Sequence, residues 1–497
     1  MYSPHLSAIS AAVLSALFTV PILATAEPIK VDSFLQLRGS NINSDGYYFE
    51  SGANLETEGE GLDEGILSLL QGGQRKTSIS FNGDASLKSG RYVFELHGVD
   101  VDINGPTGGQ ITLISEGPTS ETDWTEENAY PTSSALLIKG SDENPTKIRF
   151  NDININFITN AHSNTNKKKE ELGAGTIVVA GGAQGGAGYV ELGFNNSNVY
   201  VGFTLEGDYE QDNLAYGIIT RQNKNSLTFN NSNLKLDSNF GGVYLEETNL
   251  YADGDIFEVN SGIDFEQESH TAHNKNNGGE DHNKNIYGLY ADSNYKDYSL
   301  NFKSKYTTII GINGVQLETY RYSSSWIGSF NVNFEGEETE IIARNTNGYF
   351  DETYAFNMDY WDPSNKEDIE KNTIEFNSRI SKITNYQSAN SSIDESINGS
   401  KITGFHGEIA DIKFNNIVDI FAGAEKLNNV KEIIGLSLTG ASSATVRTAE
   451  RFSVISLTDS ESAEVTDAIQ LVNSSLSVND SGIFIGAVKS GELGNAL

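Results

Sequence analysis

Hydrophobic and polar positions alternate along much of the chain in short stretches separated by polar breaks. Residues 192–201 read LGFNNSNVYV and residues 227–236 read LTFNNSNLKL. In both, an aliphatic residue and a phenylalanine two positions apart precede the break, and two more apolar residues follow it. Side chains two apart share one face of a strand, and Asn and Ser favour turns. The pattern therefore predicts two short strands that meet at a corner.

The aliphatic–x–Phe triplet recurs and defines a repeat. It occurs at residues 79–81, 148–150, 192–194, 227–229, 263–265, 300–302, 332–334, 374–376 and 412–414. If Ile111-Thr112-Leu113 fills the one long gap, ten positions lie between Phe81 and Phe414, with a mean period of about 37 residues. A looser apolar element precedes the triplet in several units, as in YGIIT (216–220), YGLYA (287–291) and TGFHGEIA (403–410). Each unit is predicted to contain two or three strands.

Asparagine follows the repeated phenylalanine in most units. The positions are Asn82, Asn151, Asn195, Asn230, Asn377 and Asn415. Asn tolerates the left-handed backbone conformation that tight corners require, and stacked Asn side chains form hydrogen-bonded ladders when strands lie in register. An asparagine ladder is therefore expected along one corner.

A period of this length is typical of solenoids, propellers and other repeat arrays. Ten units exceed the roughly 4–8 blades of a propeller, so the sequence predicts an all-β fold, a parallel β-helix with long loop excursions. Residues 27–414 are expected to form roughly ten long-loop coils and residues 415–497 tighter coils. One short helix is predicted near 418–430. Its apolar positions are Val418, Phe421, Ala424, Leu427 and Val430.

Composition narrows the class of partner. The chain has 497 residues, a formal net charge of −35 and no cysteine. Such an acidic balance excludes nucleic acid and anionic lipid as expected partners, and the absence of cysteine excludes disulfides and thiolate metal sites.

The N-terminus predicts export. The apolar run LSAISAAVLSALFTVPILATA ends in Ala24-Thr25-Ala26, which is typical of a signal-peptide cleavage site and assigns residues 1–26 to the signal peptide. The preceding MYSPH lacks the usual Lys or Arg, and an N-terminal membrane anchor is the alternative. No membrane insertion is expected beyond this segment.

These features together resemble the passenger domain of a bacterial type V autotransporter, a pertactin-like β-helix adhesin. The resemblance covers most of residues 27–497 and rests on the signal peptide, the absence of cysteine, the acidic Asn/Gly/Ser-rich body and coils such as NSSLSVNDSG (473–482). It implies a right-handed β-helix that is secreted or displayed on the outer membrane of a Gram-negative bacterium, or periplasmic if untranslocated. The C-terminal translocator barrel of that family does not follow in this sequence.

Two segments are candidate binding sites. Residues 347–364, NGYFDETYAFNMDYWDPS, form an expected loop in which Tyr349, Tyr354, Tyr360 and Trp361 stand beside acidic residues. Flat aromatic faces beside acceptors suit recognition of sugars or proteins, although these aromatics can instead cover the solenoid.

The second candidate is a metal site in the loop ESHTAHNKNNGGEDHNKN. It contains His270, His273 and His282, and imidazole is a ligand for zinc or nickel. The irregular spacing and the Asn/Lys/Gly setting favour a solvated loop instead.

No catalytic residues and no cofactor are predicted, because acidic residues look scattered rather than repeated. The predicted function is non-catalytic adhesion or surface interaction with a host-cell or neighbouring-cell surface protein or glycan. One alternative is a truncated remnant of a longer autotransporter. Another is a carbohydrate-active β-helix enzyme, which requires carboxylates clustered on one face of the solenoid.

Overall fold

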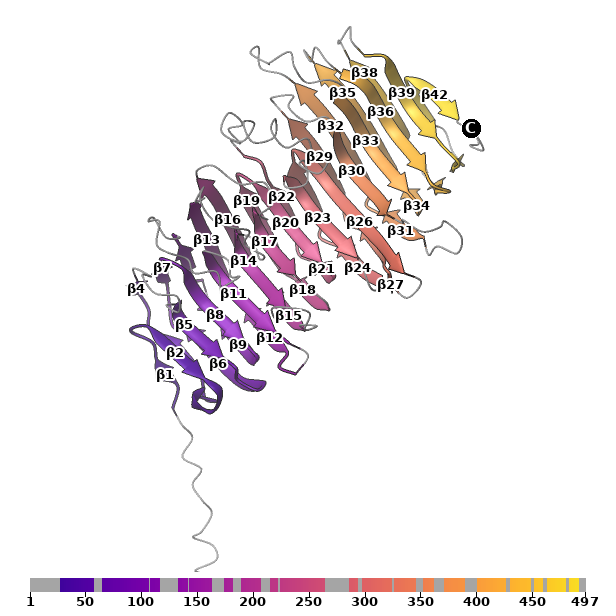
Figure 1. The fold of residues 1–497 in the computed structure, drawn as a ribbon. Coiled ribbons are helices and arrows are strands. Elements are labelled where there is room, and N and C mark those ends of the chain that lie inside the picture. The colour runs from indigo at the N-terminus through magenta and orange to yellow at the C-terminus, as the bar shows by residue number, and fades with distance from the viewer. Residues whose placement is uncertain are drawn as a thin grey trace, which may run out of the picture.

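The protein is a parallel β-helix built from three long sheets (Figure 1). The computed structural model describes residues 27–57, 65–106, 108–116, 133–141, 143–162, 174–181, 189–206, 215–221, 224–263, 286–293, 297–323, 326–345, 352–361, 371–388, 400–425, 430–447, 451–458, 463–479 and 482–490. From β3 on, successive strands belong to sheets A, C and B in turn, with β27 as an addition beside β26. Most strands therefore pair with the strand three places further along the chain. The fold predicted from the repeat is confirmed.

Sheet A has 14 strands in order along the solenoid. They are β1 (Ile29–Lys30), β3 (Tyr47–Phe49), β6 (Arg75–Phe81), β9 (Val99–Asn104), β12 (Thr146–Asn151), β15 (Val190–Asn195), β18 (Asn225–Asn230), β21 (Thr248–Ala252), β24 (Asp297–Phe302), β28 (Ser329–Phe334), β31 (Asn372–Phe376), β34 (Ala410–Asn415), β37 (Ser443–Arg447) and β40 (Ser475–Val478).

Sheet C has 13 strands. They are β4 (Ala53–Thr57), β7 (Ala85–Ser89), β10 (Ile111–Ser115), β13 (Asn154–His162), β16 (Asn198–Glu206), β19 (Asn233–Ser238), β22 (Ile256–Asn260), β25 (Tyr306–Gly311), β29 (Glu338–Asn345), β32 (Ile380–Ser388), β35 (Ile417–Glu425), β38 (Phe452–Thr458) and β41 (Gly482–Ile485).

Sheet B has 15 strands, of which β27 (Trp326–Ile327) pairs antiparallel with β26 at its side. The others are β2 (Leu35–Arg38), β5 (Gly65–Leu70), β8 (Tyr92–His97), β11 (Ser134–Gly140), β14 (Ala174–Gly181), β17 (Ala215–Arg221), β20 (Gly241–Glu246), β23 (Tyr287–Ser293), β26 (Asn313–Ser323), β30 (Glu352–Trp361), β33 (Ser400–Glu408), β36 (Val430–Thr439), β39 (Val465–Leu471) and β42 (Ala487–Ser490). A 3-10 turn, η1 (Gly39–Asn41), follows β2.

The repeated phenylalanines stack on one another inside the solenoid. Phe150, Phe194 and Phe229 are register partners on β12, β15 and β18, with ring centroids 4.9 and 5.1 Å apart. A second run joins Phe334 to Phe302 and to Phe376 at 4.7 and 5.0 Å. All six side chains are at most 1 % exposed. Within each run, one coil therefore presents the same ring to the next, which explains why the chain repeats the triplet.

The corner between sheets A and C is the predicted asparagine ladder. Asn195 donates from its side-chain amide to Asn151 at 2.9 Å, and Asn230 donates to Asn195 at 3.4 Å. At the next position Asn196 and Asn231 have φ of 50° and 47° and are themselves joined at 2.9 Å. Asn relieves the cost of this left-handed backbone, so the polar break supplies both the corner geometry and a column of hydrogen bonds.

Two of the ten predicted triplet positions are wrong. Residues 111–113 lie in β10 of sheet C, and the sheet A strand of that coil is β9. Residues 264 and 265 lie outside the described residues, and β21 supplies the sheet A strand between Phe229 and Phe302, with Ala252 in the phenylalanine position. Both errors arose because a smaller inward residue, Ile103 or Ala252, replaces phenylalanine there.

The helix predicted near 418–430 is also wrong. Its described residues belong to strands β35 and β36, Leu427 lies outside the described residues, and no described residue is in an α-helix. In β35, Val418, Ile420 and Ala422 are buried on one face, with half-buried residues between them. The two-residue period of the buried side chains decides in favour of a strand, and register pairing with β32 and β38 stabilises it.

The three sheets differ in their outer faces. Strands of sheets A and C, such as β12 and β10, alternate buried with half-buried residues. Their outer faces hold ion pairs between neighbouring coils, such as Lys147 with Glu191 at 3.0 Å. In sheet B, strands β5, β17 and β23 are buried on both faces almost throughout. Sheet B therefore differs from the other two sheets in having an outer face that is largely buried. Among the described residues, no helix is long and apolar enough to cross a membrane.

Candidate functional site

The outer face of sheet B changes character along the solenoid. From β8 to β23 it carries an apolar and aromatic cluster, flanked by ion pairs such as Lys139 with Glu95 and Arg221 with Glu246. The buried outer cluster there consists of Tyr92, Leu137, Val178, Tyr216, Ile219, Tyr244, Tyr287 and Tyr290. In register with Tyr290, the next three strands carry Gln316, Asn357 and His406. The outer face therefore becomes polar at β26 and stays so through β33.

A column of five carboxylates crosses this transition. Glu246 pairs with Asp292, Asp292 with Glu318 and Glu318 with Asp359 on consecutive strands. The register of β30 and β33 continues the column to Glu408, because Met358 pairs with Gly407 just before it. Neighbouring strands in a sheet lie about 4.8 Å apart, and like charges directly opposite one another are destabilising. Such a column needs compensating partners.

Hydrogen-bond donors on the preceding coil supply much of that compensation. Tyr244 donates its hydroxyl to Asp292 at 3.3 Å, and Tyr290 donates to Glu318 at 2.7 Å. Gln316 donates from its amide to Asp359 at 2.9 Å. Each donor lies two residues before the acid of its own strand and reaches the acid of the next strand. The column is closed on its N-terminal side by the guanidinium of Arg221, 3.3 Å from Glu246.

The carboxylate at Asp292 is the most strongly perturbed of the column. Its side chain is almost fully buried, and burial raises the pKa of the Asp292 carboxyl well above its ordinary value, assisted by the charges of Glu246, Glu247 and Glu318. Burial also raises the pKa of Asp359, against hydrogen bonds from Gln316 and Asn357. Because 44 % of the Asp359 side chain is exposed, solvent offsets part of that increase, and Asp359 marks the accessible end of the column.

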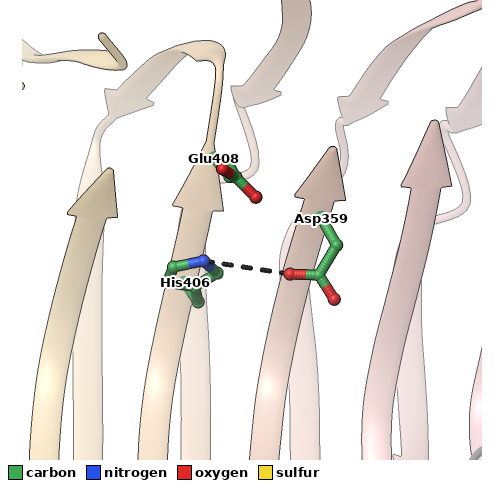
Figure 2. Close-up of side chains that lie close together, drawn as sticks. All are labelled: Asp359, His406 and Glu408. Atoms are coloured by element: carbon green, nitrogen blue, oxygen red, sulfur yellow. Dashed lines mark ion pairs between the residues drawn. The ribbon is translucent and has the colours of Figure 1, made fainter. Parts of the chain in front are cut away.

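His406 lies beside this accessible end (Figure 2). Its Nε2 is 3.9 Å from Oδ1 of Asp359, and the two side chains point toward one another from neighbouring strands. One ligand atom from each of Asp359, His406 and Glu408 lies within 4.8 Å of the others. Burial, with the nearby charge of Lys401, lowers the pKa of His406 to about 4. The imidazole is therefore neutral at pH 7, which leaves a ring nitrogen able to accept a proton or a metal ion.

The aromatic segment is arranged differently from the predicted loop. Residues 352–361 form strand β30, and Ala355, Phe356 and Met358 within it belong to the core. The alternation of inward and outward residues that identifies a strand is difficult to recognise here, because aromatic and acidic residues occupy most positions of the segment. Tyr349 lies outside the described residues, and Trp361 is described only as the last residue of the strand.

Two of the predicted ligand-binding tyrosines are described with their side chains. Tyr354 is half-buried, and its ring centroid is 6.0 Å from that of His406. It donates its hydroxyl to Glu352 at 2.6 Å, and its pKa lies above the usual range because of burial and this carboxylate. Tyr360 is buried and lies within the fold. Of the four predicted residues, Tyr354 is therefore the one shown beside the accessible end of the acidic column.

The predicted metal ligands His270, His273 and His282 all lie outside the described residues. The prediction that acidic residues are scattered is wrong for sheet B, where five of them share one column. A sequence signal was present. The segments GGVYLE (241–246), YGLYAD (287–292), NGVQLE (313–318), YAFNMD (354–359) and TGFHGE (403–408) share a small second residue and an acidic sixth residue. Two of the looser elements, YGLYA and TGFHGEIA, overlap these segments, but the acidic sixth position is not evident from them because the first ends one residue before Asp292.

Comparison of the chain with protein-family models, with curated proteins and with solved structures finds no significant match. The function therefore has to be argued from the site.

Proposed function

We propose that the protein is an exported, non-catalytic β-solenoid that binds a partner on another cell's surface, a glycan or a protein. Its binding surface is the accessible outer face of strands β30 and β33, hereafter the β30–β33 patch. The residues of this patch are Glu352, Tyr354, Asp359, Lys401, His406 and Glu408. The observation that carries the proposal is this change of sheet B from a buried outer face to a polar, partly exposed one.

The chemistry of the patch suits hydrogen-bonded recognition. Tyr354 offers an aromatic face, with the Lys401 ammonium 5.9 Å from its ring centroid. Carboxylates of Glu352, Asp359 and Glu408 offer acceptors, and parallel strands hold them at fixed spacing. An aromatic plane beside ordered polar groups is the usual composition of sugar-binding and protein-binding surfaces. Rigid strands limit the entropy lost on binding.

Replacing Tyr354 tests the proposal. Tyr354→Ala is expected to weaken binding of the purified protein to target cells or to an immobilised glycan set at least tenfold, because the aromatic surface is lost. Tyr386→Ala is a matched control, since Tyr386 is 38 % exposed on sheet C and also hydrogen-bonds a glutamate, Glu425. Surface plasmon resonance measures both. Equal loss in the two variants, or no loss in either, contradicts a binding role for this patch.

Export is the other part of the proposal, and it rests on residues 1–26 and on the resemblance to autotransporter passengers. Treating intact cells with an external protease and blotting for the chain separates the locations. Loss of the chain from intact cells supports surface display, whereas survival until the outer membrane is permeabilised places the chain in the periplasm and contradicts adhesion.

A carbohydrate-active enzyme is the second candidate, and the acidic column favours it specifically. Two carboxylates flanking a glycosidic bond are the usual machinery of glycoside hydrolysis, and Asp359 and Glu408 lie on adjacent coils beside His406. Release of reducing ends from neutral and acidic polysaccharides, abolished in Asp359→Asn, supports this candidate. Absence of release across such a panel excludes it in favour of binding.

A further inference from the structure

The cluster of Asp359, His406 and Glu408 has the donor set of a metal site. The three side chains come from two adjacent strands, β30 and β33, and each offers one ligand atom within 4.8 Å of the other two. The 3.9 Å between His406 Nε2 and Asp359 Oδ1 exceeds a hydrogen bond. It is a separation that a small side-chain adjustment closes around a shared ion.

The two carboxylates are already oriented by neighbouring donors. Asp359 accepts from Gln316 at 2.9 Å and from Asn357 at 2.8 Å, and both bonds reach the same oxygen, Oδ2. Its other oxygen, Oδ1, is the one that faces His406. Glu408 accepts from the backbone N–H of Tyr360 at 3.3 Å. Metal-binding carboxylates are commonly held by such outer hydrogen bonds, which fix the direction of the free oxygen.

Two buried polar atoms at the cluster lack partners. Asn357 is 3 % exposed, and its amide nitrogen is engaged by Asp359 and Gln316, so exchanging its O and N would break both bonds. Among the described residues, its Oδ1 has no hydrogen-bond partner. His406 is the register partner of Asn357, and its Nδ1 also has no hydrogen-bond partner among the described residues. Buried polar groups are nearly always satisfied, so these two atoms indicate a ligand-dependent arrangement of the cluster.

The unpaired atoms match the second shell of a metal-bound histidine. A ligating histidine coordinates through one ring nitrogen and donates its other N–H to an oxygen nearby. His406 has Nε2 toward Asp359, and the buried Asn357 Oδ1 stands on the neighbouring strand as an available acceptor for Nδ1–H. An ion between the carboxylates and Nε2 therefore gives both unpaired atoms a role.

We propose that Asp359, His406 and Glu408 bind a divalent transition-metal ion at the outer face of sheet B. One imidazole and two carboxylates suit zinc and its neighbours in the first transition row. Calcium and magnesium prefer sites built from oxygen ligands, with calcium taking six to eight of them. This inference does not depend on the proposed binding function, because the ion can stabilise the patch whether or not a partner binds there.

The test uses the purified full-length chain, stripped with chelator, and titrated with ZnCl2 by isothermal calorimetry. His270, His273 and His282 are replaced together by Gln in the background protein, because these residues are independent candidate ligands. The expected result is about one equivalent of zinc bound in this background. His406→Gln and Asp359→Asn, each added to it, should weaken binding at least tenfold. His97→Gln is the matched control, since His97 also lies on sheet B, in β8, and is half-buried.

Binding of Co²⁺ in place of zinc gives a spectroscopic signal that depends on the ligands of the metal. A residue that only supports the fold does not change this signal. Co²⁺ bound at this site should show visible absorption bands that His406→Gln abolishes and His97→Gln preserves, with far-UV circular dichroism unchanged in both. Absence of zinc binding in the triple-Gln background overturns the proposal, as does binding that His406→Gln leaves intact. Tighter binding of calcium than of zinc also overturns it. Failure of the Tyr354→Ala adhesion test leaves these results unaffected, so the two proposals fail separately.

Discussion

At the scale of single residues, the coil repeat places the same chemical group at one position in consecutive coils. For phenylalanine the result is favourable, because offset stacked rings gain about 0.5–1.5 kcal/mol beyond burial. For asparagine it is also favourable, because each amide both donates and accepts. For carboxylates the same stacking is costly, and Tyr244, Tyr290 and Gln316 offset it by donating to the acid of the next coil. A costly column held by dedicated donors is a reason to assign it a function.

Asp292 provides a test of that cost. Its pKa is raised in the folded state above the ordinary 3.8, so the folded protein binds more protons than the unfolded chain between these two values. Stability therefore falls as pH rises through this window. Asp292→Asn cannot ionise, and we expect it to be more stable than the wild type by about 1–3 kcal/mol at pH 8, with the difference shrinking as pH falls toward the ordinary value.

Urea unfolding followed by circular dichroism at several pH values measures this difference. Asp32→Asn is the control, because Asp32 is exposed and the same change of charge there should leave the pH dependence as in the wild type. A constant offset between Asp292→Asn and wild type at all pH values contradicts the raised pKa.

At the scale of elements, the strands of sheet B share a requirement for a small residue at one position. The second residue of its six-residue segment is small in successive coils. These residues are Gly217, Gly242, Gly288, Gly314, Ala355, Gly404, Gly435 and Ala468. A Cβ on Gly242 would lie 2.3 Å from the carbonyl oxygen of Gly288 and 2.4 Å from Val259 of sheet C. The small residues are required because the coils, and sheets B and C, approach each other closely at this position. This close approach sets the register of the strands, which in turn aligns the carboxylates four residues further along each strand.

Gly314→Val should disrupt this close approach. Its Cβ would lie 2.3 Å from the carbonyl oxygen of Ala355 and 2.8 Å from Ile341, and overpacking a core costs about 1–3 kcal/mol. Gly193→Val is the control, because the nearest atom there is 4.0 Å away, and its effect should stay within about 0.5 kcal/mol. The midpoints of urea unfolding of the two variants measure this difference in stability. Equal destabilisation of both would show that loss of glycine, rather than the local contact, causes the effect.

At the scale of the whole molecule, stability depends on contacts between adjacent coils while charge acts over many coils. Each repeat of a solenoid contacts only its neighbours. Apart from β27 and the strands at the two ends of each sheet, every strand pairs with one strand of the coil before and one of the coil after. The net charge of −35 is spread along this rod and opposes its compact state. Ion pairs such as Lys382 with Glu340 at 3.0 Å reduce the repulsion locally, without neutralising the chain.

Salt should therefore stabilise the protein. Raising NaCl from about 10 to about 150 mM shortens the Debye length from about 30 to about 8 Å, and we expect the melting temperature to rise by several degrees. Thermal scans by circular dichroism measure it. Choline chloride at equal ionic strength should act alike, since screening depends on charge alone. A melting temperature that stays constant or falls, or that responds to sodium only, contradicts this account.

Much of the fold was predictable because its signal is local and repeated. The Leu–x–Phe triplets at 192–194 and 227–229, with the NNSN break after each, contain the strand period, the corner and the inward face within ten residues. Where the inward residue is smaller, as at Ala252, the local signal weakens and the triplet assignment fails. The helix predicted near 418–430 failed for a related reason, since a few apolar positions fit two periods and only pairing with β32 and β38 distinguishes them.

The sequence alone determined the solenoid, its period and the chemistry of its corners, because these follow from residues close together in the chain. Only the tertiary structure decided the site. Asp359 and Glu408 are separated by a whole coil, yet the register of β30 with β33 brings their carboxylates and His406 together. Loops of unequal length separate the strands, so no fixed spacing relates these residues. Interstrand pairing and the small-residue column of sheet B create the alignment, and both exist only in the folded chain.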